Sequence, residues 1–215
     1  MRRLIDMVVS LILLVVLSPI FLVLATIIKL DSKGPVFFTQ MRIGKGNKLF
    51  KFYKFRTMTV GTPNVATEEL KDSVSYITRF GKVLRKTSLD ELPQLINIFK
   101  GDMAFIGPRP ALYNQYNLKK LRTKAGVHRL LPGLTGWAQV NGRDMLSDAV
   151  KTSYDKYYLE HRSITFDLKI LVRTVFKVLR CEGIIEGGRK VSIKNKDIEY
   201  EYEEVKPKVE ENAKA

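Results

Sequence analysis

The feature that most constrains this chain is an uncharged apolar segment of 22 residues near its N-terminus, Met7 to Ile28. As a straight helix it would be ~33 Å long, which is enough to cross a bilayer. Ser18 and Pro19 stand at its middle, and a proline there removes one backbone hydrogen bond and clashes with the preceding turn. We therefore predict a sharp bend at Ser18-Pro19, which leaves two arms that are each too short to span a membrane.

Basic residues flank the apolar segment on both sides. Arg2 and Arg3 precede it, and Lys29 and Lys33 follow it. Because basic flanks mark the cytoplasmic side of a membrane segment, a helix that enters and leaves on one face satisfies both ends. The sequence thus favours a re-entrant helix over residues 1–30. A straight span with a mild kink and a cleaved signal peptide are the alternatives.

Composition narrows the class of protein. The chain has 215 residues, of which 37 are Lys or Arg and 22 are Asp or Glu, so its formal net charge is +15. This length suits one folded domain of moderate size, and the charge favours nucleic acid, an anionic membrane or a phosphorylated substrate as partner. One cysteine and two histidines exclude a disulfide framework and a Cys/His zinc cluster. Any metal would be a hard cation held by carboxylates.

Two β-rich runs, 36–41 and 49–55, lie on either side of Gly44-Lys45-Gly46-Asn47 and predict a β-hairpin. The second run alternates aromatic residues with basic ones, among them Lys51 and Lys54. Such a strand more often packs its aromatics inward and keeps its lysines in solvent. The alternative is that the aromatic rings stack on nucleobases.

A pair of adjacent carboxylates, Asp90-Glu91, lies in a segment that predicts a helix ending at Gly101. Ser88 stands at capping-box spacing from Glu91, which is a purely structural reading of the pair. That reading would place Pro93 at the fifth helical position, where its missing N–H should be bonded. In either case two carboxylates lie at or near a helix N-terminus, and a functional role for them is the other interpretation.

Two loops rich in glycine and proline follow. Gly107 to Pro110 holds Arg109 in a restricted, extended backbone that suits a phosphate, and a plain turn with a solvated arginine is the alternative. Glycines in the loop Pro132 to Trp137 would allow close approach to a phosphate. Trp137 itself fits either a membrane interface or a buried loop position.

The C-terminal third predicts one basic amphipathic helix, 164–180, and then a Glu-rich tail. The basic side chains recur on one helix face and form a stripe made of Lys169, Arg173, Lys177 and Arg180. This stripe fits either anionic lipid headgroups or the solvated face of a core helix. The tail is expected to be flexible or to dock a partner.

Six motifs, in this order, together resemble one known family of bacterial sugar transferases, the monotopic phosphoglycosyltransferases, in their small, catalytic-domain-only form. They are Ser18-Pro19, FTQMRIGKGNKLFKFYKFRTM, TSLDELPQL, GDMAFIGPRP, LPGLTGWAQVNGRD and TFDLKIL. The resemblance covers about residues 1–183. It implies a mostly helical α+β fold with a re-entrant membrane helix (1–30), a catalytic domain with a small β-hairpin and amphipathic interfacial helices (31–183), and a separate tail (184–215).

Enzymes of this kind transfer a sugar 1-phosphate from a UDP-sugar to a polyprenyl phosphate such as undecaprenyl phosphate and release UMP. They work at the cytoplasmic face of the bacterial inner membrane and begin glycan assembly. The resemblance implies that Asp90 attacks the β-phosphorus to form a phosphosugar-aspartyl intermediate, that Glu91 assists, and that Mg²⁺ binds at Asp90. The residues implied on the substrate's phosphates and uridine are Arg85, Arg109, Arg143 and the Pro108-Arg109-Pro110 triplet.

The implied partners are a UDP-sugar, polyprenyl phosphate and anionic membrane lipids, with no nucleic acid, and a homo-oligomer is left open. The alternative class is a non-enzymatic, membrane-anchored basic module that binds anionic lipid or nucleic acid. The pair Asp90-Glu91 discriminates between the two, because a pure anion binder gains nothing from two carboxylates among its arginines.

Overall fold

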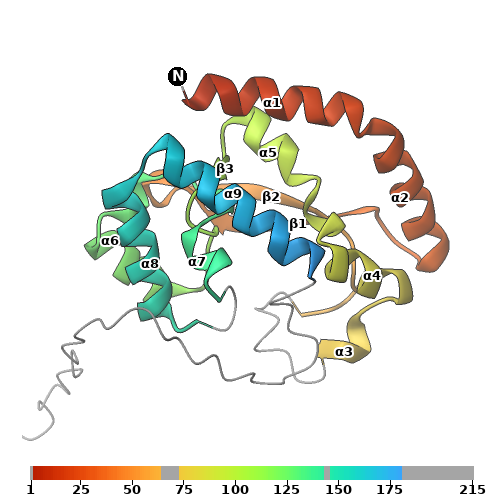
Figure 1. Cartoon of the computed structure of the whole chain (residues 1–215). Helices are drawn as coiled ribbons and strands as arrows, with labels where there is room; N and C mark the ends of the chain where they lie inside the picture. The colour runs from red at the N-terminus through yellow and green to blue at the C-terminus, as the bar shows by residue number, and fades with distance from the viewer. Residues whose placement is uncertain (1, 64–72, 143–145, 181–215) are drawn as a thin grey trace, which may run out of the picture.

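The computed structural model describes residues 2–63, 73–142 and 146–180 of the chain. This part is mostly helical, as predicted, and contains two small sheets (Figure 1). The helices are α1 (Arg2–Val16), α2 (Ser18–Asp31), α3 (Ser73–Tyr76), α4 (Arg79–Thr87), α5 (Gln94–Lys100), α6 (Tyr116–Lys124), α7 (Trp137–Val140), α8 (Asp148–His161) and α9 (Ile164–Leu179). The strands are β1 (Phe37–Ile43), β2 (Leu49–Phe55), β3 (Ala104–Ile106) and β4 (Gly133–Thr135), and short 3₁₀ turns are η1 (Lys45–Asn47), η3 (Leu89–Glu91) and η4 (Val127–Arg129).

The predicted bend in the apolar segment is confirmed. Helices α1 and α2 meet at Leu17 with an angle of 61° between them. Pro19 has no N–H to give to the carbonyl of Val15, and the hydroxyl of Ser18 donates to that carbonyl instead, at 2.8 Å. No single described helix is long and apolar enough to cross a membrane, although the two helices taken together have the necessary length and composition.

The inner face of the bent pair packs on the rest of the domain. Leu13, Leu14 and Leu17 contact a core cluster made of β2 and α5 residues and Met103, and Phe21 packs against Phe55 of β2. Arg3 donates to the carbonyls of Ile98 and Phe99 at the C-terminal end of α5 (2.6 and 2.9 Å). The outer face is apolar and exposed, with Leu4, Ile5, Val8, Leu11, Ile12, Val15, Val16, Ile20, Leu22 and Val23.

The predicted hairpin is also confirmed. Strands β1 and β2 pair antiparallel, with Phe37 opposite Phe55 and Ile43 opposite Leu49. Gly46 and Asn47 both have positive φ in the connecting turn, which is the conformation that glycine and asparagine tolerate best. Most aromatics of β2 are buried, as predicted, with Phe52 only 2% exposed.

A second sheet was not predicted. Strands β3 and β4 pair in parallel, with Ala104 opposite Gly133 and Ile106 opposite Thr135, and the connection between them contains α6. The contact is very close, because a Cβ atom at Gly133 would overlap the backbone of Gly107. The glycines of the two loops thus allow one loop to pack closely against the other. The sequence alone indicates only a close approach of these loops to a phosphate.

Helix α9 places the first two residues of the basic stripe beside Trp137. Lys169 and Arg173 lie over the ring of Trp137, at 5.7 and 5.0 Å from its centroid. Trp137 is 8% exposed and packs among α8 and α9 aromatics, so the buried alternative for this residue holds. The face of α9 that points away from the body is apolar and exposed, with Ile164, Leu168, Leu171, Val172, Val175 and Leu179.

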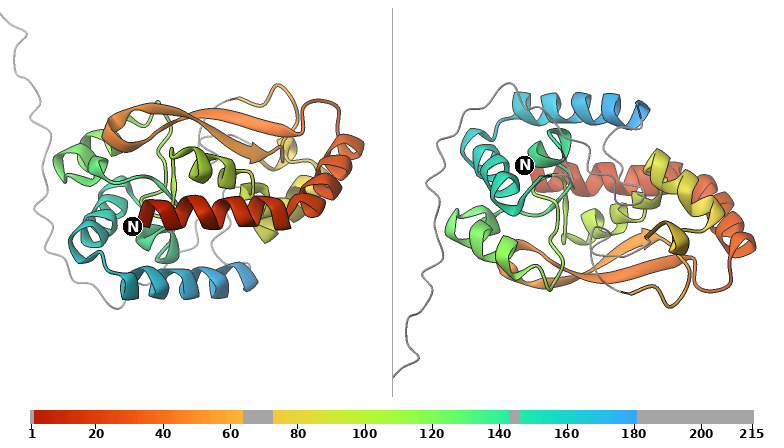
Figure 2. Two further views of the ribbon diagram at one scale, coloured as in Figure 1. Left: turned by 90° about the horizontal axis from the view of Figure 1, so that it is seen from above. Right: turned by 90° about the horizontal axis from the view of Figure 1, so that it is seen from below.

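Figure 2 shows the hairpin and α9 at opposite edges of the molecule, with α1 between them. An ion pair of 3.4 Å between Arg2 and Asp167 joins the N-terminal ends of α1 and α9. The bent pair and α9 therefore form a connected part of the surface.

Candidate active site

The two carboxylates lie on the short 3₁₀ turn η3, between α4 and α5. Ser88, which ends α4, has φ of +57°, a left-handed conformation that is rare for a residue other than glycine. Its side chain caps neither helix, so the capping-box interpretation is wrong. Helix α5 begins only at Gln94, with Pro93 as its N-cap residue, which resolves the conflict that Pro93 posed. The reversal at Ser88 places Asp90 and Glu91 in the interior, at 6% and 7% exposed.

Asn97 of α5 fixes the segment that carries Asp90 and Glu91, here called the dyad, against the hairpin. Its amide nitrogen donates to the carbonyl of Lys51 (2.7 Å), and its amide oxygen accepts from the backbone N–H of Tyr53 (3.1 Å). The side chain is fully buried. Because α5 follows η3 directly, this pair of hydrogen bonds brings β2 alongside the carboxylates.

Two cations meet the carboxylates. The ammonium of Lys54 on β2 lies 3.2 Å from Asp90 Oδ2 and 3.2 Å from Glu91 Oε1. The guanidinium of Arg109 donates to the same Glu91 oxygen from both terminal nitrogens, at 3.2 Å. The expectation that Lys54 stays in solvent is therefore wrong, since its side chain is only 18% exposed.

All three carbonyls of the Pro108-Arg109-Pro110 triplet accept hydrogen bonds from other elements. The donors are Gly133 N to Pro108 (2.9 Å), Arg122 Nη1 to Arg109 (2.7 Å) and Arg42 Nη1 to Pro110 (3.0 Å). The prolines have no N–H and a fixed φ, so the triplet has little freedom left. The side chain of Arg109 is thereby held toward Glu91.

A buried ion pair supports this loop from behind. Arg122 on α6 donates from Nε and Nη2 to Asp155 Oδ2 on α8, at 2.9 and 2.6 Å. Burial raises the pKa of the Asp155 carboxyl, and the adjacent Arg122 guanidinium counteracts that rise. The same guanidinium is the one that donates to the Arg109 carbonyl, so α6, α8 and the triplet are joined through one side chain.

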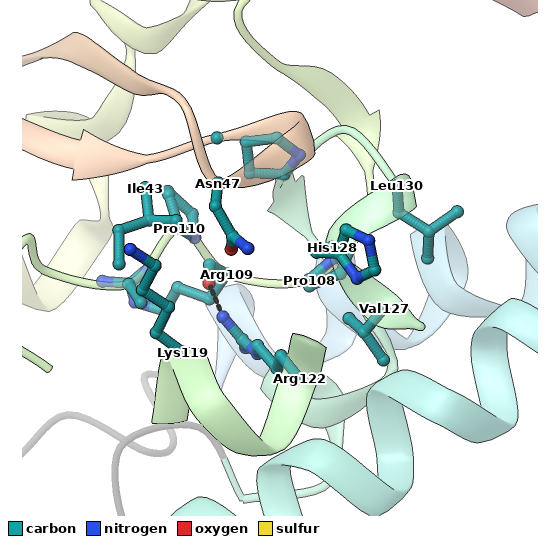
Figure 3. A pocket seen from close by; sticks show the side chains of 13 residues that line it. Ile43, Asn47, Pro108, Arg109, Pro110, Lys119, Arg122, Val127, His128 and Leu130 are labelled. Carbon is teal, nitrogen blue, oxygen red and sulfur yellow. Dashed lines mark hydrogen bonds between the residues drawn. The ribbon is translucent and has the colours of Figure 1, made fainter. Parts of the chain in front are cut away.

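A small pocket lies beside the triplet (Figure 3). Arg109 contributes to its lining, and its other polar lining side chains include Asn47, Lys119 and His128. The Nδ1 atom of His128 is buried and has no hydrogen-bond partner within the part of the chain that the structure describes. Arg109 thus lines the pocket and also contacts the carboxylate of Glu91.

The two carboxylates fit a magnesium ion whose remaining coordination positions are filled by water or by a substrate. Nowhere in residues 2–63, 73–142 and 146–180 do three or more Asp, Glu, His or Cys side chains gather as a metal group. Mg²⁺ commonly takes one or two protein carboxylates and obtains its other ligands from water and substrate phosphates. Asp90 and Glu91 supply that number of hard oxygen donors.

The structure brings together most of the residues that the sequence singled out. Asp90, Glu91 and Arg109 are in one cluster, and Arg85 lies in the last turn of α4, just before the reversal at Ser88. Arg143 and the tail 184–215 lie outside the described residues. Lys54 was missed as a site residue, because a strand lysine among aromatics has the same local pattern whether it meets solvent or a carboxylate.

Comparison with known proteins assigns the family. The sequence profile of the family described as bacterial sugar transferase matches residues 1–181. This protein is a bacterial sugar transferase. The match ends beside α9, at the point where the Glu-rich tail follows.

Three relatives illustrate the similarity of this sugar transferase to known members. It is 42% identical to the uncharacterized sugar transferase EpsL of Bacillus subtilis (strain 168), covering 86% of this chain and 90% of the relative. It is 37% identical to a UDP-glucose:undecaprenyl-phosphate glucose-1-phosphate transferase of Caulobacter vibrioides (85% and 71%). It is 38% identical to a UDP-N-acetylgalactosamine-undecaprenyl-phosphate N-acetylgalactosaminephosphotransferase of Aeromonas hydrophila (83% of this chain), of which it spans only 43%.

Proposed function

We propose that this sugar transferase moves a sugar 1-phosphate from a UDP-sugar to undecaprenyl phosphate and releases UMP, as a first membrane step of bacterial glycan assembly. The names of the Caulobacter and Aeromonas relatives support the reaction class. The observation that carries the proposal in this chain is the Asp90-Glu91 pair, buried and in contact with two cations. A site that only binds anions would have no use for it.

Asp90 is the nucleophile of the proposed reaction. Its carboxylate oxygen forms a bond to the β-phosphorus as the bond from that phosphorus to the UMP oxygen breaks. An oxygen of the lipid phosphate then attacks the same phosphorus, and the Asp90 carboxylate leaves. One site thereby serves a water-soluble donor and a lipid acceptor in turn.

The cations of the site reduce the repulsion between the Asp90 carboxylate and the anionic diphosphate. Arg109 reaches Glu91 from a rigid loop, so its guanidinium is already held beside the carboxylates where the diphosphate would arrive. Glu91 assists Asp90, and Arg85 and Arg143 are the further basic residues proposed for the phosphates. Asp90, with Glu91 beside it, would hold Mg²⁺, which supplies charge neutralisation on the diphosphate.

The uridine side of the donor is assigned to the pocket beside Pro108-Arg109-Pro110. That pocket borders the carboxylates through Arg109 and offers polar groups from Asn47 and His128 to a base (Figure 3). Its place is consistent with a nucleotide that lies along the triplet, with its diphosphate directed to Asp90.

Membrane attachment is assigned to the bent pair α1–α2, entering and leaving on the cytoplasmic face, and to α9. Both present exposed apolar faces, and the Arg2–Asp167 ion pair joins them. An apolar helix face lying in the interface binds by burying that area among the lipids. The basic side chains of α9 lie beside this face, where anionic headgroups would meet them.

The central experiment replaces Asp90 with asparagine. The Asp90→Asn protein should remain folded and membrane-bound, but it should release no UMP from any UDP-sugar and form no covalent phosphosugar adduct detectable by mass spectrometry. Glu160→Gln, which changes an exposed carboxylate on α8, is a matched control outside the dyad. Full UMP release by Asp90→Asn would refute the nucleophile assignment, and a panel of UDP-sugars with the wild-type protein identifies the donor.

A further inference from the structure

Lys54 contacts both carboxylates of the dyad, and its position affects how a metal can enter the site. We infer that Lys54 is an internal counter-cation of Asp90 and Glu91, which a divalent metal must displace before it can bind there. The inference deepens the proposed function and rests on it for the reason that a metal is needed. Lys54 would thereby affect the order in which the metal and the nucleotide enter the site.

One ammonium uses oxygens of both carboxylates. Lys54 Nζ lies 3.2 Å from Asp90 Oδ2 and 3.2 Å from Glu91 Oε1, so it bridges the two side chains. A metal ion that bound between the same side chains would compete for these oxygens. It would also be repelled by the ammonium at close range, in a site where little solvent screens the charges.

The local charge of the site also opposes entry of a metal alone. The formal charges of Asp90 and Glu91 are balanced by those of Lys54 and Arg109, which contact them directly. A divalent cation that enters alone would leave this cluster with a net positive charge. A diphosphate that arrives with the metal removes that imbalance, so metal and nucleotide should load together.

Packing and the strand pairing hold Lys54 in its position. It comes from β2, which Asn97 fixes to α5, and its ammonium lies 5.9 Å from the ring centroid of Phe52. Its side chain is 18% exposed, whereas Lys51 on the same strand is exposed. Displacement by the metal would free the ammonium beside the incoming diphosphate, where it gains a new anionic partner.

The test measures Mn²⁺ binding without nucleotide, by electron paramagnetic resonance of the full-length protein in detergent. Lys54→Met should bind Mn²⁺ about tenfold more tightly than the wild-type protein, as expected for a competing cation that is removed. Lys51→Met, on the same strand, should match the wild type. Adding Asp90→Asn to Lys54→Met should abolish the gain, which locates the metal at the dyad.

Unchanged or weaker Mn²⁺ binding by folded Lys54→Met would overturn the inference. The wild-type protein supplies a second measurement in case the variant does not fold. Saturating Mn²⁺ should increase the rate at which an amine-acetylating reagent modifies Lys54 and leave Lys51 unaffected, as followed by mass spectrometry. An unchanged rate at Lys54 would also overturn the inference. Both readouts are independent of sugar transfer, so failure of the proposed reaction would be seen separately, in the UMP assay.

Discussion

At the scale of single residues, the site depends on side chains and backbone conformations that are unusual for their surroundings. Ser88 adopts a left-handed conformation at a cost of about 1–3 kcal/mol, and this reversal turns Asp90 and Glu91 inward. Lys54 is a strand lysine that faces carboxylates instead of water. Such local exceptions are typical of functional sites.

Tyr158 offers a test of residue-level electrostatics away from the dyad. Burial, and then the hydrogen bond and negative charge of Asp167, raise the pKa of this phenol well above its ordinary value of 10. The neutral phenol, which donates to Asp167 at 2.7 Å, therefore stabilises the fold below pH 10, and this contribution is lost as the pH rises further.

Tyr158→Phe should accordingly lower the free energy of unfolding by about 1–2 kcal/mol at pH 8. The difference from the wild-type protein should shrink between pH 10 and 11.5, because the unfolded wild-type chain ionises there. Chemical denaturation at several pH values checks this, with Tyr157→Phe as control. A difference that stays constant with pH would contradict the assignment.

At the scale of elements, the Pro108-Arg109-Pro110 loop is held by donors that come from β1, α6 and β4. Arg122 joins two acceptors there, because its planar guanidinium donates both to the Asp155 carboxylate and to the Arg109 carbonyl. A lysine cannot serve both acceptors with the same geometry.

Arg122→Lys should therefore raise KM for the UDP-sugar more than it lowers kcat, and should reduce stability by about 1–3 kcal/mol. Steady-state UMP release and thermal unfolding measure the two effects. Arg129→Lys, on the neighbouring η4 turn and exposed, should change neither. Equal KM values for Arg122→Lys and the wild type would show that the loop keeps its position without this guanidinium.

The sequence allowed the hairpin, the bend and the end of α5 at Gly101 to be predicted, because each depends on local turn or helix chemistry. It did not allow the parallel pair of β3 and β4 to be predicted, because two three-residue strands, with α6 between them, have no local signature. Lys54 was missed for a related reason. Its contact with Asp90 joins residues 36 positions apart, and only tertiary packing through Asn97 creates it.

At the scale of the whole molecule, the bent pair α1–α2 packs on one side against the hairpin and α5 and leaves its outer side apolar. The bend depends on one missing N–H and one hydroxyl, at Pro19 and Ser18. Pro19→Ala restores the missing donor and should favour one continuous helix over residues 2–31, ~45 Å long and able to cross a bilayer.

That substitution should change topology and lower activity together. In a Cys181→Ser background, cysteines placed at Arg2 and at Lys33 should label from one side of the membrane when Pro19 is present, and increasingly from opposite sides in Pro19→Ala. An impermeant maleimide reports the labelling, and Val23→Ala is the matched control on the exposed face. Opposite-side labelling in the protein that retains Pro19 would refute the re-entrant assignment.

The 61° angle between α1 and α2 has a mechanical consequence for the lipid around it. In the proposed re-entrant arrangement, arms of 15 and 14 residues would add cross-sectional area to one leaflet and none to the other. Such a wedge relieves packing stress where the host leaflet is convex. The shape of the anchor would thus make the energy of attachment depend on membrane curvature as well as on lipid charge.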